Sequence, residues 1–420
     1  MRIPGFRVPG LAPALRPVLT VLFCLVLIPA APAAGQQMPF TLGDALARAR
    51  DTSPEGAAAD ARVEAAQRAL DVSGRLLNPV AEFRWENWGS LAPAPGLPPD
   101  VFATLTQTVE LGGKRALRRD TAAAGLGIAR AGASVARSLL ALDITRAYME
   151  ALRARERQGL LATRADELGE LVRVLASRVA AGTTAEADLL KMRTEQARAG
   201  ADVVRARLAA TRALATLTAR LDVDTTLDAL ARPAVPLPAS TDVREALERR
   251  ADVVAAGQAI DSARLAVRVE DARRIPDVAV NAGLKRTAGF NSGVVAVTMP
   301  IPVFERNRSA RILAQGQLLA AERDRDAVAR RAMADITATR MAATELASRA
   351  REVQTTLVEP ARGALDAARS AFASGALDVL RVLDAERVYT DAMLIALDLD
   401  IDAAVSAIEA RLAAGEAPLP

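Results

Sequence analysis

Two stretches of alternating polar and apolar residues, each followed by a very long helical pattern, organise this chain. The first lies at residues 80–88 and 101–110, where a period of two predicts a β-hairpin. Residues 114–181 then carry apolar side chains at seven-residue spacing, which predicts one helix about 100 Å long. A glycine, Gly182, breaks this pattern, and a second helix is expected at 185–221.

The same order of elements returns about 190 residues further along the chain. Strands are expected at 277–286 and 293–302, and long helices at 307–374 and 377–413. Gly375 stands at the break between these helices, as Gly182 does in the first half. Such repetition makes a chance coiled-coil pattern a poor explanation.

The two halves are therefore interpreted as tandem structural repeats, residues 35–232 and 242–420, joined by a proline-rich linker at 233–241. Each repeat is predicted to run helix, β-hairpin, long helix, helix. The fold is thus mostly α with a small β portion. Pro360 is expected to kink or divide the second long helix.

Local signals mark several helix ends. Thr41 with Asp44 three residues later is close to a capping box. Pro54 suits the first turn of a second helix, which is expected to run to about Leu77. Thr184 is a candidate N-cap for the helix after Gly182.

The N-terminus has the pattern of a secretory signal peptide, expected at residues 1–34. Basic residues precede an apolar core, Val18–Ile28, and small residues follow it. Cys24 lies inside the core rather than after it, so a lipid anchor is not expected. Removing this segment takes three arginines from a formal charge of +4 and leaves a nearly neutral chain, which gives no argument for nucleic acid as a partner.

Composition restricts the chemistry. The chain is 51% hydrophobic but only 3% aromatic, which suits thin, closely packed helices. It has no histidine and one cysteine, Cys24. After signal removal no soft metal site and no His- or Cys-based catalysis are expected. We expect no cofactor and no enzymatic activity.

Each hairpin is about as tall as a tilted strand crossing a membrane. One chain supplies two hairpins, and an open four-stranded sheet in lipid would leave backbone groups unpaired along its edges. Small membrane barrels need about eight strands. Several copies must therefore pool their hairpins, and the long helices would continue the cylinder away from the membrane.

These features resemble the outer-membrane efflux protein family, the channel components of tripartite exporters. The resemblance rests on Thr41–Leu46, Gln107–Arg115, Pro300–Phe304 and Glu359–Leu365, in this order and spacing. It implies a homotrimer in the outer membrane of a Gram-negative bacterium, with a twelve-stranded β-barrel and a periplasmic α-helical barrel. It also implies two partners, a periplasmic adaptor and an inner-membrane efflux pump. The Glu110–Arg115 form looks most like the branch serving heavy-metal cation pumps.

The resemblance implies that the two helical tips dock the adaptor. The candidate residues are exposed turn positions: Gly182, Thr183, Thr184, Ser374, Gly375 and Leu377. Glycine at a helix–helix turn is also ordinary C-cap chemistry that needs no partner.

Two carboxylates follow the tips. Asp188 and Asp378 would form a cation-selecting ring in a trimer. The simpler interpretation is that Asp378 favours a helix N-terminus and that Asp188 pairs with Lys191 or Arg193.

The polar face of the first hairpin, Glu82, Arg84 and Glu86, is expected to line the barrel lumen, and the opposite face would meet outer-membrane lipid. Lys114 and Arg115 at the strand-to-helix junction suit either lipid headgroups or pairs between subunits.

Alternative functions are a drug-efflux or type I secretion channel of the same family, a periplasmic coiled-coil structural protein, and a hydrolase with paired carboxylates. The structural protein would have no need of amphipathic hairpins. The carboxylates are spread along helix faces beside arginines, which disfavours the hydrolase.

Overall fold

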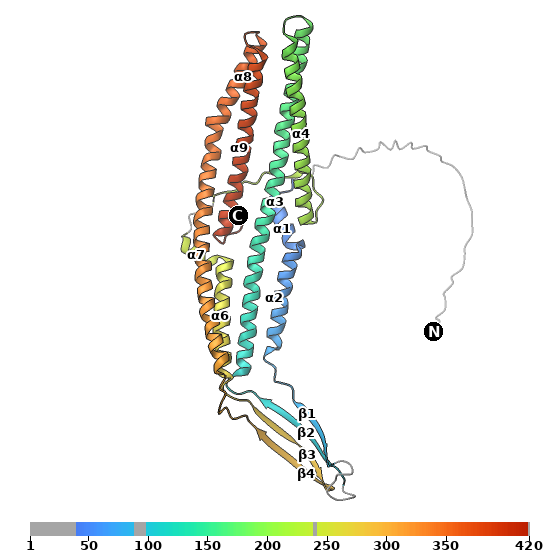
Figure 1. Ribbon diagram of the computed structural model, residues 1–420, viewed down its shortest axis with the longest axis vertical. Coiled ribbons are helices and arrows are strands. Elements are labelled where there is room, and N and C mark those ends of the chain that lie inside the picture. Colours follow the sequence, from blue (N-terminus) through green and yellow to red (C-terminus); the bar gives the residue numbers. More distant parts are fainter. Residues whose placement is uncertain (1–38, 88–97, 238–241, 419–420) are drawn as a thin grey trace, which may run out of the picture. The chain divides into compact units, whose positions relative to one another are not determined.

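The computed structural model describes residues 39–87, 98–237 and 242–418 (Figure 1). The expected signal peptide, the tip of the first hairpin and part of the linker lie outside these residues. The first half contains α1 (Leu42–Thr52), α2 (Pro54–Ser73), β1 (Val80–Glu86), β2 (Asp100–Val109), α3 (Lys114–Ala180), α4 (Glu186–Leu221) and the short 3₁₀ turn η1 (Leu227–Ala229). The second half contains α5 (Val243–Arg249), α6 (Ala251–Ala272), β3 (Val278–Thr287), β4 (Phe290–Thr298), α7 (Arg308–Val353), the π-helical turn η2 (Gln354–Val358), α8 (Glu359–Ala373) and α9 (Val379–Ala413). The expected mostly helical fold with a small antiparallel sheet is confirmed.

The four strands form one antiparallel sheet in the order β1-β2-β3-β4 (Figure 1). The pairing of β2 with β3 joins the two hairpins, and the amide of Asn281 donates to the hydroxyl of Thr106 across it at 2.8 Å. Among the described residues, β1 and β4 are the edge strands of the sheet, and each pairs with one other strand only.

The second hairpin is tighter than expected. The turn consists of Ala288 and Gly289, both with positive φ (48° and 87°), as a two-residue hairpin turn of type I′ requires. Strand β4 therefore begins at Phe290 instead of 293. It ends at Thr298 instead of 302, where Pro300 and Pro302 cannot donate backbone hydrogen bonds.

The helices next to the sheet lie side by side in the same chain order as the strands β1 to β4. Helix α2 packs on α3, α3 on α6, and α6 on α7, so α2 and α7 are the outer members of this row. The long helix α3 also forms an antiparallel pair with α4, and α9 packs along α7 and α8. None of the described helices is both long and apolar enough to pass through a bilayer.

The largest core lies where α1, α3, α4 and α9 meet. Tyr148 is fully buried there, and its hydroxyl binds the backbone of Phe40 and Ala231 at 2.7–2.9 Å. These two contacts hold the parallel bridge between Phe40 and Leu230. Burial raises the pKa of Tyr148 to about 12 and keeps the phenol protonated as a donor.

Two further local expectations need correction, and a third, that Pro360 kinks or divides its helix, is confirmed. Helix α2 ends at Ser73 and not near Leu77, because side chains from α3 bind the backbone carbonyls that follow. The N-cap of α4 is Ala185, not Thr184, and it makes no side-chain cap bond. Pro360 does divide its helix, and the break is the π-helical turn η2, which absorbs the clash that proline makes with the preceding turn.

Other local expectations agree with the structure. Thr41 and Asp44 form a reciprocal capping box, and α2 begins at Pro54.

Candidate functional site

The sheet has one polar and one apolar face. Glu82, Arg84 and Glu86 share the polar face, where Arg84 lies 3.2 Å from Glu86 and 3.9 Å from Glu82. The opposite face is apolar and exposed across all four strands. Its large side chains are Phe83, Trp85, Leu105, Leu284, Val295 and Val297. Exposure of so many large side chains on one face indicates an apolar surrounding in the working molecule.

The polar face continues across the second hairpin. Phe102 of β2 pairs with Arg84 of β1 on one side and with Lys285 of β3 on the other. The guanidinium of Arg84 lies 4.6 Å from the centre of the Phe102 ring, and the ammonium of Lys285 lies 5.1 Å from the same point. Sequence analysis named only the acidic and basic residues of β1. The alternation of residues in β2 and β3 also predicts that Phe102 and Lys285 lie on the polar face. The register of β1, β2 and β3 places Phe102 between Lys285 and Arg84.

The strand-to-helix junction is held by the motif Glu110–Arg115. Gly112 and Gly113 have φ of 67° and 73°, so the chain turns there in a conformation that suits glycine. A Cβ on Gly112 would lie 3.1–3.3 Å from Ile275 and from the carbonyl of Ala272. The motif therefore permits a close approach between the start of α3 and the end of α6.

Charged side chains at this junction bind within one chain. Lys114 donates to Asp277 at 2.7 Å, and the amide of Leu111 donates to the same carboxylate at 3.0 Å. Arg115 donates to the carbonyl of Gly74 at 2.6 Å. The sequence left lipid headgroups and inter-subunit pairs open for Lys114 and Arg115, whereas both bind residues of their own chain.

Arg118 completes the junction. It pairs with Glu110 through two hydrogen bonds of 2.6 and 3.1 Å and also donates to the carbonyls of Ser73 and Arg75. This side chain thus ties the end of β2 to the segment that enters β1. Bidentate guanidinium–carboxylate geometry favours a fixed orientation.

The two helical tips are built alike. Gly182 and Gly375 have φ of 71° and 79°. At the first tip the amides of Gly182 and Thr183 donate to the carbonyls of Val179 and Arg178, both at 2.9 Å. The second tip repeats this double bond through Gly375 and the residue after it, so both are Schellman-type C-caps. A Cβ on either glycine would meet nothing within 4 Å, so both turns are open to a partner.

An ion network with one buried member, Glu386, lies behind the tips. Arg369 of α8 binds Glu167 of α3 at 2.6 Å and Glu386 of α9 at 2.8 Å. Burial and the nearby charge of Glu167 raise the pKa of Glu386. Sequence analysis missed this network. One signal was available, because Glu386 follows Val379 and Val382 on the apolar stripe of α9.

Two further contacts tie the helical pairs together. Arg387 of α9 binds Glu195 of α4 at 2.6 Å, and its hydrogen bond holds the pKa of that carboxyl below its usual value. Arg178 lies 4.3 Å from the ring centre of Phe372 and donates to its carbonyl. The α3–α4 pair is thereby joined to the α8–α9 pair.

The two candidate aperture carboxylates have local roles. Asp378 is the N-cap of α9 and accepts from the amide of Leu380 at 3.3 Å. Asp188 lies in the first turn of α4, 4.0 Å from Lys191. Each occupies the position that the simpler sequence interpretation assigned to it.

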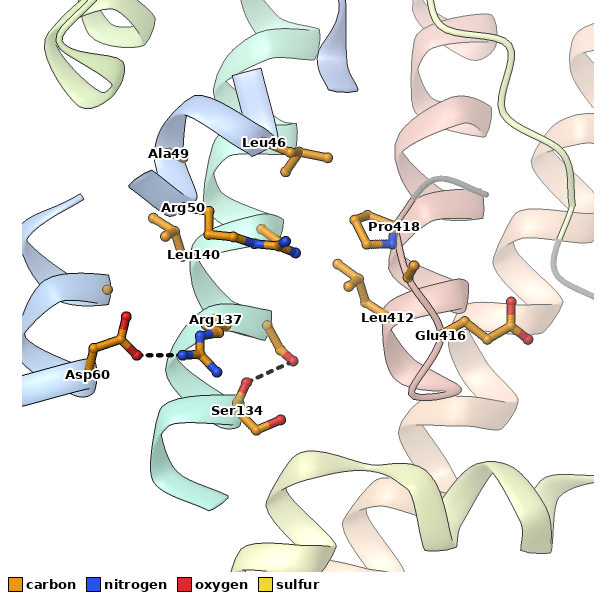
Figure 2. Close-up of a pocket in the computed structure, with 14 residues that line it drawn as sticks. Leu46, Ala49, Arg50, Asp60, Ser134, Arg137, Leu140, Leu412, Glu416 and Pro418 are labelled. Atoms are coloured by element: carbon orange, nitrogen blue, oxygen red, sulfur yellow. Dashed lines mark hydrogen bonds and ion pairs between the residues drawn. The ribbon is translucent and has the colours of Figure 1, made fainter. Parts of the chain in front are cut away.

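A pocket lies between α1, α3 and the C-terminal segment (Figure 2). Leu46, Leu140 and Leu412 line it with the charged side chains of Arg50 and Arg137. In the described parts of the chain no three His, Cys, Asp or Glu side chains gather as a metal site.

Comparison with known proteins places this geometry in context. Residues 243–416 match the family described as outer membrane efflux protein. The cobalt-zinc-cadmium resistance protein CzcC of Cupriavidus metallidurans is 31% identical over 310 residues, which cover 70% of this chain and 71% of that protein.

Solved structures share the fold. The outer membrane protein VceC of Vibrio cholerae superposes with a TM-score of 0.74 at 21% identity, covering 90% of this chain and 96% of that one. CusC, whose structures concern folding and transmembrane channel formation, gives 0.72 at 17% identity over 89% and 92%.

Proposed function

This chain belongs to the outer membrane efflux protein family, and we propose that it is the outer-membrane channel of a tripartite exporter of heavy-metal cations. It conducts its substrate passively from the periplasm to the exterior. The observation that carries the proposal is the amphipathic four-stranded sheet with two unpaired edges, continued by helices of up to 67 residues.

The two edges of the sheet support the homotrimer that we propose. Strands β1 and β4 have unpaired backbone groups on their outer sides, which are very costly to leave unpaired in lipid. Three copies joined β4 to β1 make a closed barrel of twelve strands. Helices α2 and α7, the outer members of their row, meet in the same joint. The apolar face then contacts lipid, and Glu82, Arg84 and Glu86 line the lumen.

Adaptor docking is proposed at the tips. A helix of 67 residues puts the α3–α4 turn about 100 Å from the sheet. Rigid exposed turns on a long scaffold are suited to recognition. The docking surface consists of Gly182, Thr183, Thr184, Ser374, Gly375 and Leu377.

Metal cations are proposed as the cargo because the curated relative is a cobalt-zinc-cadmium resistance protein. The acidic side chains next to the tips, Asp188 and Asp378, suit transient passage of cations better than capture. Specificity is then set by the pump, as expected for a passive conduit.

The test is made with the whole exporter. Deleting this gene is expected to lower tolerance to cobalt, zinc and cadmium, and the purified protein is expected to conduct ions across a planar bilayer. Unchanged metal tolerance together with clear conductance would keep the channel and reject the metal cargo. A purified trimer without conductance would reject the channel itself.

A further inference from the structure

The segment that follows β4, residues 300–306 with Pro300 and Pro302, is apolar and exposed, and its backbone is held by hydrogen bonds. Ile301 is 77% exposed and Phe304 is 100% exposed. The two prolines of this segment restrict its φ angles. The amide of Val303 donates to the carbonyl of Ile301 at 2.9 Å, and Arg306 donates to that of Pro302 at 3.2 Å. The exposure therefore belongs to a fixed backbone, and these side chains need a cover that the described residues of one chain do not supply.

The segment that precedes β1 has the same character. Leu76 is 67% exposed, and Leu77 and Val80 are also exposed. The backbone here is fixed by α3 and β2, since the carbonyls of Gly74, Arg75 and Leu77 accept from Arg115, Arg118 and Gln107 at 2.6–3.0 Å. The apolar side chains point outward although their backbone is tied down.

Sheet topology places these two segments on opposite edges but at the same end. Successive strands are antiparallel, so β1 and β4 run in opposite directions. The chain enters β1 and leaves β4 at the helical end of the sheet. When β4 of one copy pairs with β1 of the next, residues after β4 come beside residues before the neighbouring β1.

We infer that Leu76 of one copy packs against Ile301 and Phe304 of the next, forming an apolar joint directly below each barrel seam. The inference rests on the proposed trimer. The joint continues into the helices, since Val72 at the end of α2 and Ile312 at the start of α7 are exposed on the corresponding edges. Burial of these side chains favours association through the hydrophobic effect.

Lipid is the other possible cover for Phe304. A lipid-facing role gives no reason for the exposed apolar groups to lie on the two edges of the sheet at the same end. Here the groups are paired on the two edges that closure brings together, and each is held by its own chain. The pairing favours a second copy as the occupant.

Cysteine cross-linking tests the joint in the full-length protein purified in detergent. Outside the expected signal peptide the chain has no cysteine, so any disulfide that forms involves the introduced thiols only. The variant Leu76→Cys/Phe304→Cys is expected to form covalent dimers and trimers on oxidation, as is the independent pair Leu77→Cys/Ile301→Cys. The control Leu76→Cys/Phe290→Cys puts one thiol at the first residue of β4, beside the turn at the far end of the sheet, and is expected to stay uncross-linked.

The mass of the oligomer shows whether the proposed joint fails alone or the proposed trimer fails as well. If both test pairs are trimeric and neither cross-links, the joint is wrong and the proposed trimer stands. If the unmodified protein is monomeric in detergent and in bilayers, the proposed channel assembly fails first. Quenching of a fluorophore on Phe304→Cys by brominated phospholipid, without cross-linking of either pair, would assign the surface to lipid and overturn the inference.

A matched pair of phenylalanines measures the contribution of the joint. Phe304→Ala is expected to lower the temperature at which the trimer dissociates in detergent. Phe290→Ala removes an exposed phenylalanine outside the joint and is expected to leave it unchanged. Equal shifts in the two variants, or no shift in Phe304→Ala, would contradict the proposed packing.

Discussion

Arg369 and Glu386 are 2.8 Å apart, and the glutamate side chain is only 2% exposed. The arginine also binds Glu167, so a single guanidinium lies between two carboxylates on different helices. The hydroxyl of Thr390 is 3.5 Å from the second oxygen of Glu386. A buried carboxylate of this kind needs its partner, because removing one member of a buried pair leaves a desolvated charge.

Arg369→Ala is therefore expected to loosen the helical pairs behind the tips. The loss is about 2 kcal/mol of local stability, since Glu386 can take up a proton when its partner is gone. Hydrogen exchange of the α8 and α9 amides should become faster. Arg173→Ala, which removes an exposed pair with Glu170, is the matched control and should change little. Equal exchange in both variants would show that the buried network does not hold the helices.

The pH dependence of this network follows from the raised pKa of Glu386, whose ordinary value is 4.5. A carboxyl with a raised folded-state pKa contributes stability that is present below the unfolded value and is lost as pH rises through the folded value. Acidification from neutral pH should therefore raise the protection factors of the amides around Glu386, which are exchange rates corrected for the intrinsic rate at each pH. Glu386→Gln should remove this dependence. A pH profile that the variant leaves unchanged would assign the effect to another group.

The pair of Glu195 with Arg387 should respond in the opposite direction. Its carboxyl has a lowered pKa, caused first by the hydrogen bond from Arg387. Its contribution is present above the ordinary value of 4.5 and is lost as pH falls through the folded value. The protection factors of the neighbouring α4 amides should fall only in strong acid, and Glu195→Gln should abolish that acid-dependent step. A fall in protection already at mildly acidic pH would contradict the assignment.

Two glycines in the second hairpin give a clean contrast. A Cβ on Gly283 would lie 2.2 Å from the carbonyl oxygen of Ala103 and 2.6 Å from the Cα of Thr104. Gly283→Ala must displace the backbone of β2 and is expected to cost more than about 3 kcal/mol. Gly293→Ala meets nothing within 4 Å and should be tolerated. The yield of folded protein in the outer membrane is the measurement, and similar yields would contradict this β2–β3 packing.

The tips allow backbone strain to be separated from docking. Gly375→Ala has space for its methyl group but must hold φ near 79°, at a cost of about 1 kcal/mol. Gly375→Asn accepts that conformation more readily and adds a polar side chain to the exposed turn. If the tip binds the adaptor, Gly375→Asn should weaken adaptor co-purification while thermal stability stays close to the parent. Intact co-purification in both variants would remove this turn from the docking surface.

Asp378→Asn tests charge at the proposed aperture without removing the helix cap. Asparagine caps as well as aspartate, so α9 should keep its N-terminus. Single-channel recordings are expected to show a weaker preference for cations. Asp378→Ala, which loses the cap at about 1 kcal/mol, serves as the stability control. Unchanged ion preference in the asparagine variant would leave Asp378 with its capping role alone.

Local patterns in the amino-acid sequence are enough to predict the types and order of the elements. A change of period from two to a helical repeat marked both hairpins and both long helices, and Gly182 and Gly375 marked the tips, because these signals depend only on local backbone geometry. The ends of helices are harder to predict where a side chain from a distant part of the sequence binds the backbone at the helix end. Arg118 binds the carbonyl of Ser73 and helps end α2 before its apolar pattern stops.

Which charged groups meet depends on how the helices pack in the folded chain. Periodicity assigns a residue to a face, but it does not say which helix that face packs on. Lys114 therefore had several plausible partners in the sequence and has Asp277 in the fold, 163 residues away. In the sequence, Glu386 is one of many carboxylates on helices. In the fold, α8 brings Arg369 into contact with it, and α3 brings Glu167 to the same arginine. Long-range electrostatic pairing depends on packing distance and burial, which a one-dimensional pattern does not contain.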